Sequence, residues 1–379
     1  MPSDDAIKTE RTASLAGAFS SADESPAAIA FQAHLRMVKG QVDGALATRL
    51  DALRVRLREV GGADLEVVAD AMKSLVIRGG KRFRPALLVA AYEACGGEGG
   101  IAATLGGCEA LELLQTYLLI HDDWMDGDDL RRGGPTVHAA LRAHFQDAFR
   151  GDAFGILAGD MASSMAQAAL AGSRLAPGRV LAASREFAQL QVDVVLGQML
   201  DMQGAASTDA QMDRLHELKT GSYTVRGPLL MGAALAAASP AARASLERFA
   251  RPVGLAFQVR DDLLGTFGDS AKTGKSDVCD LRRGKRTALL VEAEKDPASA
   301  PYLNGVVGVA QASEGDLAAL RNWLTESGVR ARVEARLSSL LGEARQALDD
   351  APPSEFTALT AQGRLVLLGA VEALGYREQ

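Results

Sequence analysis

A long apolar helix with an acidic end is the feature that most constrains how this chain can fold. Residues 105–126 read LGGCEALELLQTYLLIHDDWMD, apolar on nearly every face, and five aspartates fall within the eight positions from Asp122 to Asp129. A helix that is apolar all round is buried. Its carboxyl end carries partial negative charge, which disfavours each nearby aspartate by a few tenths to ~1 kcal/mol. The chain must therefore surround this helix with other elements and bring positive charge to its end.

The rest of the chain predicts more helices. From about Leu50 onward, apolar residues recur at intervals of three and four, and the pattern breaks at Gly-Gly, Pro or Asp clusters into about ten segments. Clusters of β-branched residues are sparse, and neither a repeat nor a Pro-, Gly- or Ser-rich linker divides the chain. We predict an all-α protein, with a single large helical bundle around a central cavity over residues 36–379. Residues 1–35, rich in Ser, Ala, Asp and Thr, are expected to form a flexible N-terminal tail.

Composition excludes several classes of function. The three cysteines and five histidines show neither Cys-x-x-Cys nor His-x-x-x-His spacing, so we expect no disulfide framework and no transition-metal site. No secretory signal is evident, and no stretch reaches the ~20 uninterrupted apolar residues of a membrane span. A net charge of −7 argues against nonspecific nucleic-acid binding, which needs a basic surface. We expect a soluble protein of the reducing cytoplasm whose anionic ligands are held by local basic clusters.

Two acidic pairs predict a magnesium site. Asp122 and Asp126 are four residues apart and share one face of the apolar helix, so both can reach one cation. Asp261 and Asp262 again end an apolar helix, in residues 254–269. Carboxylates on two helices that face each other across a cavity suit Mg²⁺, which keeps several waters and binds through few carboxylates plus substrate phosphates. Such ions would supply the positive charge that the helix end needs.

Basic loops flank these carboxylates. RGGKRFRP (78–85) combines four cations with a Gly-Gly turn whose backbone can approach a phosphate closely, and DDLRRGGP (128–135) adds two arginines. A third cluster, AKTGKSDVCDLRRGKRT, spans 271–287. These charges fit a ligand with many negative charges, neutralised in part by Mg²⁺, and the apolar helices leave a cavity for the rest of the molecule. Those properties describe a prenyl diphosphate.

Five motifs in this order resemble the trans-type isoprenyl diphosphate synthases, the polyprenyl synthetases. They are GGKRFRP, LLIHDDWMDGDDLRRGGPTVH, GQMLDM, LKTGSYT, and AFQVRDDLLGTFGD followed by TGKSDVCDLRRGKRT. Two positions depart from the family pattern: Gly265 stands where many members carry a third Asp of the second acidic motif, and Gln115 stands where His is frequent. A Gln amide can still donate to a diphosphate oxygen.

The resemblance implies a role for each matching residue. Three Mg²⁺ ions would be bound by Asp122, Asp126 and Asp261, supported by Asp123 and Asp262. Isopentenyl diphosphate would be bound by Lys81, Arg84, Gln115 and Arg132. The allylic diphosphate would be bound by Arg131, Lys219, Lys275 and Lys285. The cation that forms when this diphosphate leaves would be faced by the dipoles of the Lys219 carbonyl region, Thr220 and Gln258. The isopentenyl double bond then attacks the cation, and a proton passes to the released diphosphate.

Other conspicuous residues have plainer interpretations. We expect Arg82 and Arg283 to be solvated, because neither matches a family position that binds substrate. His121 is expected to pack or to hydrogen-bond at the end of its helix. The small residues of 153–171 predict a close contact between two helices.

Two residues before the first acidic motif predict the product length. Tyr117 and Leu118 lie five and four places before Asp122, about one turn, or 5.4 Å, below the metals or slightly more. In the family, rings at both places stop growth at fifteen carbons, whereas a single ring at the fifth place resembles the archaeal-type geranylgeranyl synthases. We predict geranylgeranyl diphosphate, with twenty carbons, and farnesyl diphosphate as the alternative. Tyr117 could instead be a core aromatic, with the floor of the cavity built elsewhere, for example by a partner subunit.

The same sequence bears on assembly and on rival functions. The family and the abundance of apolar helices predict a homodimer. A class I terpene cyclase would carry an Asn/Asp-Asp-x-x-Ser-x-x-x-Glu pattern in its second half, and the chain has none. A non-catalytic regulatory subunit of a heteromeric synthase usually lacks an acidic motif, whereas both Asp-Asp pairs are present here. We predict a catalytic prenyltransferase and keep the regulatory subunit as an alternative.

Overall fold

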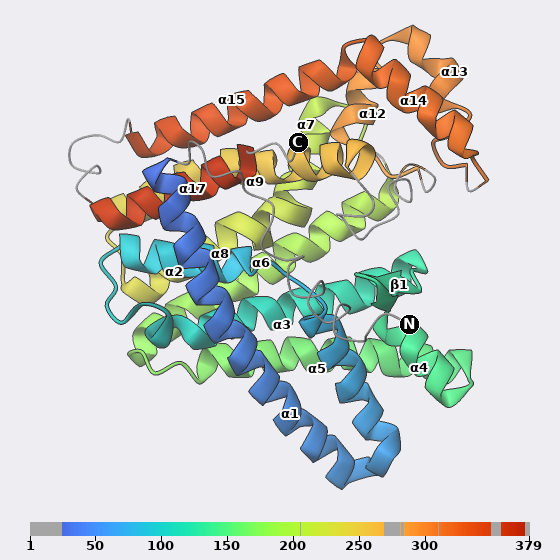
Figure 1. Ribbon diagram of the computed structural model, residues 1–379. Coiled ribbons are helices and arrows are strands. Elements are labelled where there is room, and N and C mark those ends of the chain that lie inside the picture. The colour runs from blue at the N-terminus through green and yellow to red at the C-terminus, as the bar shows by residue number, and fades with distance from the viewer. Residues whose placement is uncertain are drawn as a thin grey trace, which may run out of the picture.

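The computed structural model confirms the all-α fold (Figure 1). It describes residues 25–204, 206–268, 281, 284–309, 311–349 and 358–375. Within these residues the only strands are β1 (Leu130–Arg131) and β2 (Gly134–Pro135), a short antiparallel hairpin between α3 and α4. The helices, in chain order, are α1 (Pro26–Ile77), α2 (Phe83–Ala94), α3 (Gly100–Asp126), α4 (Val137–Phe145), α5 (Ala148–Ala171), α6 (Pro177–Gln203), α7 (Asp209–His216), the π-helix η1 (Glu217–Arg226), α8 (Gly227–Ala236), α9 (Pro240–Phe267), α12 (Ala288–Ala293), the 3₁₀ turn η2 (Pro297–Ser299), α13 (Ala300–Leu303), α14 (Glu314–Glu326), α15 (Val329–Asp349) and α17 (Ala361–Gly375).

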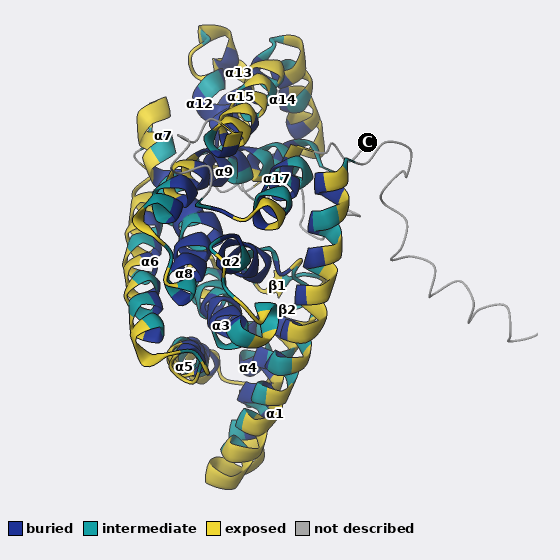
Figure 2. Cartoon of the chain, turned by 90° about the vertical axis from the view of Figure 1, so that its left-hand side faces the viewer, coloured by how far each residue is buried: buried dark blue, intermediate teal, exposed yellow. Residues whose placement is uncertain are grey.

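The apolar helix of the sequence, α3, lies at the centre of the bundle. It packs against α5, α2 and α1, and Figure 2 shows α2, α3 and α8 as largely buried, whereas α1 and α6 each have an exposed face. Leu111, Leu113 and Leu114 are fully buried. One hydrophobic core joins side chains from α1 through α17. The surrounding helices therefore determine where the acidic end of α3 lies. None of the described helices combines the length and the hydropathy that crossing a membrane requires.

α1 begins earlier than expected. The Ser25 hydroxyl caps it by accepting a hydrogen bond from the Ala28 backbone N–H at 3.1 Å, and Pro26 stands in the first turn. Phe31 is 1% exposed and belongs to the core. Residues 26–35 are thus helical and packed, so the expected tail boundary at residue 35 is wrong. The sequence pattern did not reveal this helix start. Its first buried residues are Ala27 and Ala28, and the preceding segment is also rich in alanine.

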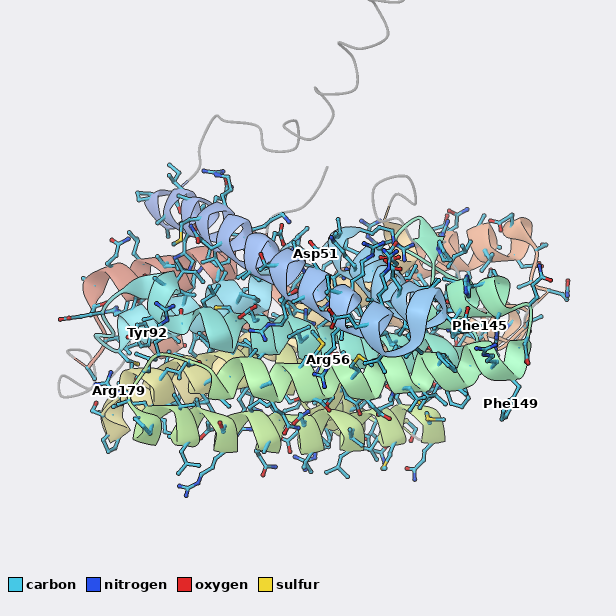
Figure 3. The ribbon with its side chains drawn as sticks, turned by 90° about the horizontal axis from the view of Figure 1, so that it is seen from below. Asp51, Arg56, Tyr92, Phe145, Phe149 and Arg179 are labelled. Atoms are coloured by element: carbon cyan, nitrogen blue, oxygen red, sulfur yellow. The ribbon has the colours of Figure 1, made fainter. Side chains whose placement is uncertain are left out.

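α1 has two arms that meet at Gly61 and Gly62. Gly62 has φ +68°, a left-handed conformation that favours glycine. Figure 3, seen from below, shows α1 crossing obliquely over the other helices. The labelled residues Asp51 and Arg56 belong to its first arm, before the bend. The second arm ends at Ile77 and leads directly into the basic loop 78–82. The bend therefore brings that loop back toward the centre of the molecule.

Candidate active site

The end of α3 turns two aspartates outward and one inward. Asp122 is half-buried and Asp126 is exposed, and their spacing of four places both on one face. Asp123, one residue further round the helix, is 0% exposed. Burial raises the pKa of the Asp123 carboxyl to about 6, although the charge of Arg131 opposes the shift. Asp122 and Asp126 are thus accessible to a ligand, whereas the carboxyl of Asp123 is enclosed by the protein.

The β1–β2 hairpin brings the first positive charge to the end of α3. Arg131 forms an ion pair with Asp123, and its Nη2 lies 3.7 Å from Asp122 Oδ2. Burial by itself lowers the pKa of Arg131, but the charge and hydrogen bond of Asp123, together with the charges of Asp122 and Asp128, outweigh this, and the pKa is raised overall. Arg131 therefore remains charged and holds the hairpin against α3.

A second cation reaches Asp122 from η1. Lys219 Nζ forms an ion pair with Asp201 of α6 and lies 3.9 Å from Asp122 Oδ1. Gln198, one turn before Asp201, donates from Nε2 to the same Asp122 oxygen at 3.1 Å. The three elements α3, α6 and η1 therefore meet at Asp122.

Sequence reasoning assigned no role to Gln198 or Asp201. Both lie in GQMLDM, and their spacing of three within an apolar helix was a signal that could have found them. Gly197, beside them, allows η1 to approach, because a Cβ there would lie 2.3 Å from the Lys219 backbone nitrogen. π-helical turns are frequent at functional sites. The π-helix η1 places Lys219 and Thr220 at the site around Asp122.

Thr220 and Gln258 form a hydrogen-bonded chain that ends at Asp262. Thr220 Oγ1 donates to Gln258 Oε1 at 2.5 Å, and Gln258 Nε2 donates to Asp262 Oδ1 at 2.7 Å. Asp262 Oδ2 accepts from the Ala288 backbone N–H at 2.8 Å. Asp262 is 7% exposed, whereas the neighbouring Asp261 is exposed. α9 thus repeats the arrangement of α3, with one aspartate turned outward and its neighbour turned inward.

His216 closes the buried side of this region. Its Nε2 lies 3.7 Å from Asp262 Oδ2, and burial lowers the pKa of the imidazole to about 4, so it is neutral at pH 7. Lys285 and Asp201 both lie close enough for their charges to influence His216. Lys275 and Arg283 lie outside the described residues.

A cluster of arginines adjoins the first group of charges. Burial lowers the pKa of Arg132, Glu112 acts in the opposite direction, and the charges of Arg131, Arg82 and Arg84 lower the pKa further. The cationic side chains therefore lie close enough to repel one another. Like charges gathered in this way raise the local concentration of an anion.

Arg84 adds hydrogen-bond donors to this cluster. Arg84 Nη2 donates to Thr224 Oγ1 at 2.9 Å, and the guanidinium lies 4.3 Å from the ring centroid of Tyr223. The buried Nε of Arg84 has no partner among the described residues. Lys81 is exposed and Gln115 is half-buried. A buried donor without a partner costs ~1–3 kcal/mol, so this group is suited to an anionic ligand.

Arg82 is buried, and the expectation that it would be solvated is wrong. It is 5% exposed and forms ion pairs with Glu112 of α3 and, from Nε, with Asp43 of α1 at 2.7 Å. Its Nη2 donates to the Val76 carbonyl at 3.0 Å. The loop sequence shows several cations without distinguishing them. The two carboxylates that pair with Arg82 belong to other helices, α1 and α3.

Tyr117 and Leu118 lie on adjoining faces of α3. Leu118 is half-buried and lies one turn below Asp122 on the same face. Tyr117 packs edge-on against His121, with ring centroids 4.8 Å apart. Burial raises the pKa of Tyr117, and the charge of Asp160 on α5 adds to the shift. Leu118 therefore lies directly beneath the first acidic motif, and Tyr117 lies beside it toward α5.

His121 hydrogen-bonds at the end of α3, as predicted. Its Nε2 lies 3.0 Å from the Ile156 carbonyl, to which an N–H there donates. A Cβ at Gly159 would lie 2.2 Å from His121 Nε2, and one at Gly106 would lie 2.5 Å from a backbone oxygen of α5. The close helix contact predicted for 153–171 is confirmed as the α3–α5 interface.

The sequence matches one protein family over most of its length. The model of the polyprenyl synthetase family matches residues 65–324. This chain belongs to the polyprenyl synthetase family. The matched region contains both acidic pairs, the arginine cluster and Lys219.

Several polyprenyl synthetases resemble the chain over most of their own length. The geranylfarnesyl diphosphate synthase of Aeropyrum pernix is 32% identical over 291 residues, 75% of this chain and 88% of that protein. A (2E,6E)-farnesyl diphosphate synthase of Mycobacterium bovis is 34% identical over 288 residues, 73% of this chain and 77% of that protein. A Corynebacterium glutamicum geranylgeranyl pyrophosphate synthase, crystallised with isoprenyl diphosphate and magnesium, superposes with a TM-score of 0.80 at 32% identity, covering 88% of this chain and 97% of that one. The chain is a prenyltransferase of the isoprenyl diphosphate synthase type.

The family is magnesium-dependent, and the described residues fit this ion in one particular way. Among them, no three acidic, His or Cys side chains form a ready-made metal cluster. Asp122, Asp126 and Asp261 offer hard oxygen ligands at the ends of two helices. Mg²⁺ usually takes one or two carboxylates, several waters and substrate phosphates. The residues therefore fit Mg²⁺ that binds together with a diphosphate, and not one held in a cage of protein ligands.

Proposed function

We propose that the protein condenses isopentenyl diphosphate with allylic diphosphates by head-to-tail 1′–4 elongation, and that geranylgeranyl diphosphate is its main product. The observation that carries the proposal is the position of the β1–β2 hairpin between the carboxylates of α3 and the arginine cluster. Arg131 faces the carboxylates of α3, and the next residue, Arg132, joins the crowded arginine cluster. Two adjoining anion sites, one with carboxylates for Mg²⁺ and one with cations alone, suit two diphosphates of which one must ionise.

The residues divide between the two substrates accordingly. The allylic diphosphate would be held by Arg131, Lys219, Lys275 and Lys285, together with Mg²⁺ on Asp122, Asp126 and Asp261. Isopentenyl diphosphate would be held by Lys81, Arg84, Gln115 and Arg132. When bound, Mg²⁺ neutralises the allylic diphosphate and makes it a better leaving group. The inward aspartates, Asp123 and Asp262, position the outward ones through their hydrogen bonds to neighbouring elements.

The reaction follows from these positions. The allylic carbon–oxygen bond breaks, its electron pair leaves with the diphosphate, and Lys219 stabilises the added negative charge. The Thr220 hydroxyl and the Gln258 amide present their dipoles to the allylic cation. The isopentenyl double bond attacks C1 of that cation to form the new carbon–carbon bond. A proton then passes from C2 of the isopentenyl unit to the released diphosphate, which removes the need for a side-chain base.

The twenty-carbon product is supported by the residues beneath Asp122. Leu118 has no ring to close the space on that face, whereas Tyr117 lies to one side and can border a longer chain. Farnesyl diphosphate remains the alternative, since relatives of similar identity carry the names of both shorter and longer products. The carbon number of the product is therefore the most specific part of this proposal.

The function is tested by supplying purified protein with dimethylallyl and isopentenyl diphosphates and Mg²⁺, and analysing the products by mass spectrometry. We expect geranylgeranyl diphosphate, and no product after addition of EDTA. The control variant Asp122→Ala should be inactive with an unchanged circular dichroism spectrum. Failure of the wild-type protein to elongate any allylic substrate from ten to twenty carbons would refute the proposal and favour a regulatory subunit.

We also propose that the protein is a homodimer that pairs through α6. Five apolar side chains share the outer face of this helix and are 36% to 66% exposed: Val192, Val195, Leu196, Met199 and Met202. Figure 2 shows α6 along an outer edge of the molecule. A contiguous apolar face of this kind marks a protein contact, and a twofold axis lets the same face cover itself. Light scattering should give twice the chain mass of 39.7 kDa, and Leu196→Asp with Met199→Asp should give a monomer. A wild-type monomer in dilute solution would refute the dimer.

A further inference from the structure

Arg82 combines an unusual backbone with a fully engaged side chain. It precedes α2 and has φ +53° and ψ +35°, the left-handed region that a bulky residue rarely adopts. Such a conformation costs on the order of 1–3 kcal/mol and persists only where the surroundings enforce it. The side chain provides that enforcement, because each of its nitrogens has a partner on a different segment.

The partners of Arg82 join three parts of the fold. Nε binds Asp43 in the first arm of α1, Nη1 binds Glu112 of α3, and Nη2 donates to the Val76 carbonyl near the end of α1. Arg82 and Glu112 are 5% and 3% exposed. With every nitrogen engaged and almost no exposed surface, the guanidinium cannot also bind a substrate phosphate.

The neighbours of this ion pair are the residues that the proposed function assigns to isopentenyl diphosphate. Lys81 directly precedes Arg82, and Arg84 follows two residues later in the first turn of α2. Gln115 lies three residues after Glu112 and therefore on the same side of α3. The one ion pair thus joins the segment 81–84, which carries two of these ligands, to the helix that carries the third.

We propose that the buried Arg82–Glu112 ion pair is a positioning device that sets the spacing between Lys81, Arg84 and Gln115, and that Arg82 itself contacts no substrate. The inference rests on the proposed function. Lysine cannot replace Arg82 in this role, because a single ammonium on a flexible stem cannot engage three partners in fixed directions. Glu112 also acts electrostatically on Arg132, so the same carboxylate moderates the charge of the pocket.

The test is steady-state kinetics of Arg82→Lys with each substrate varied in turn. We expect the KM for isopentenyl diphosphate to rise about tenfold, which corresponds to ~1.4 kcal/mol of binding. The KM for the allylic substrate should change less than about twofold, since that diphosphate is bound by other residues. Equal increases for both substrates, or no change for either, would overturn the proposal.

The chain contains a matched control. Arg49 of α1 binds Glu109 of α3 through two hydrogen bonds of 2.9 Å, and Glu109 lies one turn before Glu112. This pair also joins α1 to α3, but Arg49 does not lie in the basic loop. Arg49→Lys should leave the KM for isopentenyl diphosphate unchanged, even where it lowers the thermal midpoint. If it raises that KM as much as Arg82→Lys does, the effect is general loosening of the two helices and the proposal fails.

A milder variant covers the case in which Arg82→Lys does not fold. Glu112→Gln keeps the length of the side chain and a hydrogen-bond acceptor, and removes the negative charge of the buried pair with Arg82. We expect a rise of about threefold in the KM for isopentenyl diphosphate, and an unchanged KM would overturn the inference. Absence of elongation by the wild-type protein would instead refute the proposed function, so the two failures are distinguishable.

Discussion

Replacing Lys219 by alanine should slow ionisation of the allylic substrate and leave isopentenyl diphosphate binding unchanged. Lys219 Nζ lies between Asp201 and Asp122, at the position where the departing diphosphate would gain charge. The arginine cluster that would bind isopentenyl diphosphate does not depend on it. The variant therefore separates stabilisation of the leaving group from binding of the second substrate.

The size of the effect follows from the distance. A unit charge that develops on the departing diphosphate about 4 Å from Lys219 Nζ would interact with it by about 4 kcal/mol at an effective dielectric of ~20. The Lys219 side chain is 21% exposed, so solvent screens part of this energy. A loss of ~2.7 kcal/mol of transition-state stabilisation corresponds to a roughly hundredfold lower kcat. Lys219→Arg keeps the charge and should recover part of the rate.

The assay is single-turnover and steady-state kinetics with mass-spectrometric detection. Lys73→Ala is the matched control, because Lys73 is also a partly exposed lysine, 28%, paired with a helix carboxylate, but it lies on α1 away from the site. Its kcat should equal that of the wild-type protein. If Lys219→Ala lowers kcat less than about threefold with its fold intact, or raises the KM for both substrates equally, the assignment of Lys219 to the leaving group is wrong.

The second acidic pair, Tyr117 and Cys95 can each be tested by a single measurement. Asp261→Ala should abolish activity and, because this side chain is exposed, should change the thermal midpoint less than Asp262→Ala does. Asp262→Ala should lower the free energy of unfolding by about 1–3 kcal/mol, because the Ala288 N–H loses its acceptor. Equal midpoints for the two variants would contradict the assignment of Asp261 as outward and Asp262 as inward. Tyr117→Ala should shift the products toward longer chains, since the space left by the ring can take another isoprene unit; an unchanged distribution with activity retained would move the chain-length determinant elsewhere. Burial raises the pKa of the Cys95 thiol to about 11, so its alkylation by iodoacetamide, followed by peptide mass spectrometry, should be slow at pH 8 and increase about tenfold per pH unit up to pH 10; rapid alkylation at pH 7 would contradict the burial of this side chain.

The helices and the outward aspartates could be predicted because local geometry governs them. The periodicity of three and four identified the elements, and the all-round apolar character of 105–126 identified α3 as the central helix. The spacing of four placed Asp122 and Asp126 on one face without knowledge of any other element. Each of these properties depends on a single helix and its own sequence.

The partners of the charged residues were decided by the tertiary structure. Nothing within RGGKRFRP distinguishes buried Arg82 from accessible Lys81, because the distinction comes from Asp43 and Glu112 on two other helices. Gln198 and Asp201 likewise acquire their contacts only when α6 meets η1 and α3. Several cations and carboxylates compete as partners, and the energy of each pair depends on its distance and burial, which the packing of distant helices sets. The amino-acid pattern therefore shows which residues form helices and which chemistry they carry, whereas the packing of distant helices selects which charges neutralise one another and which stay accessible.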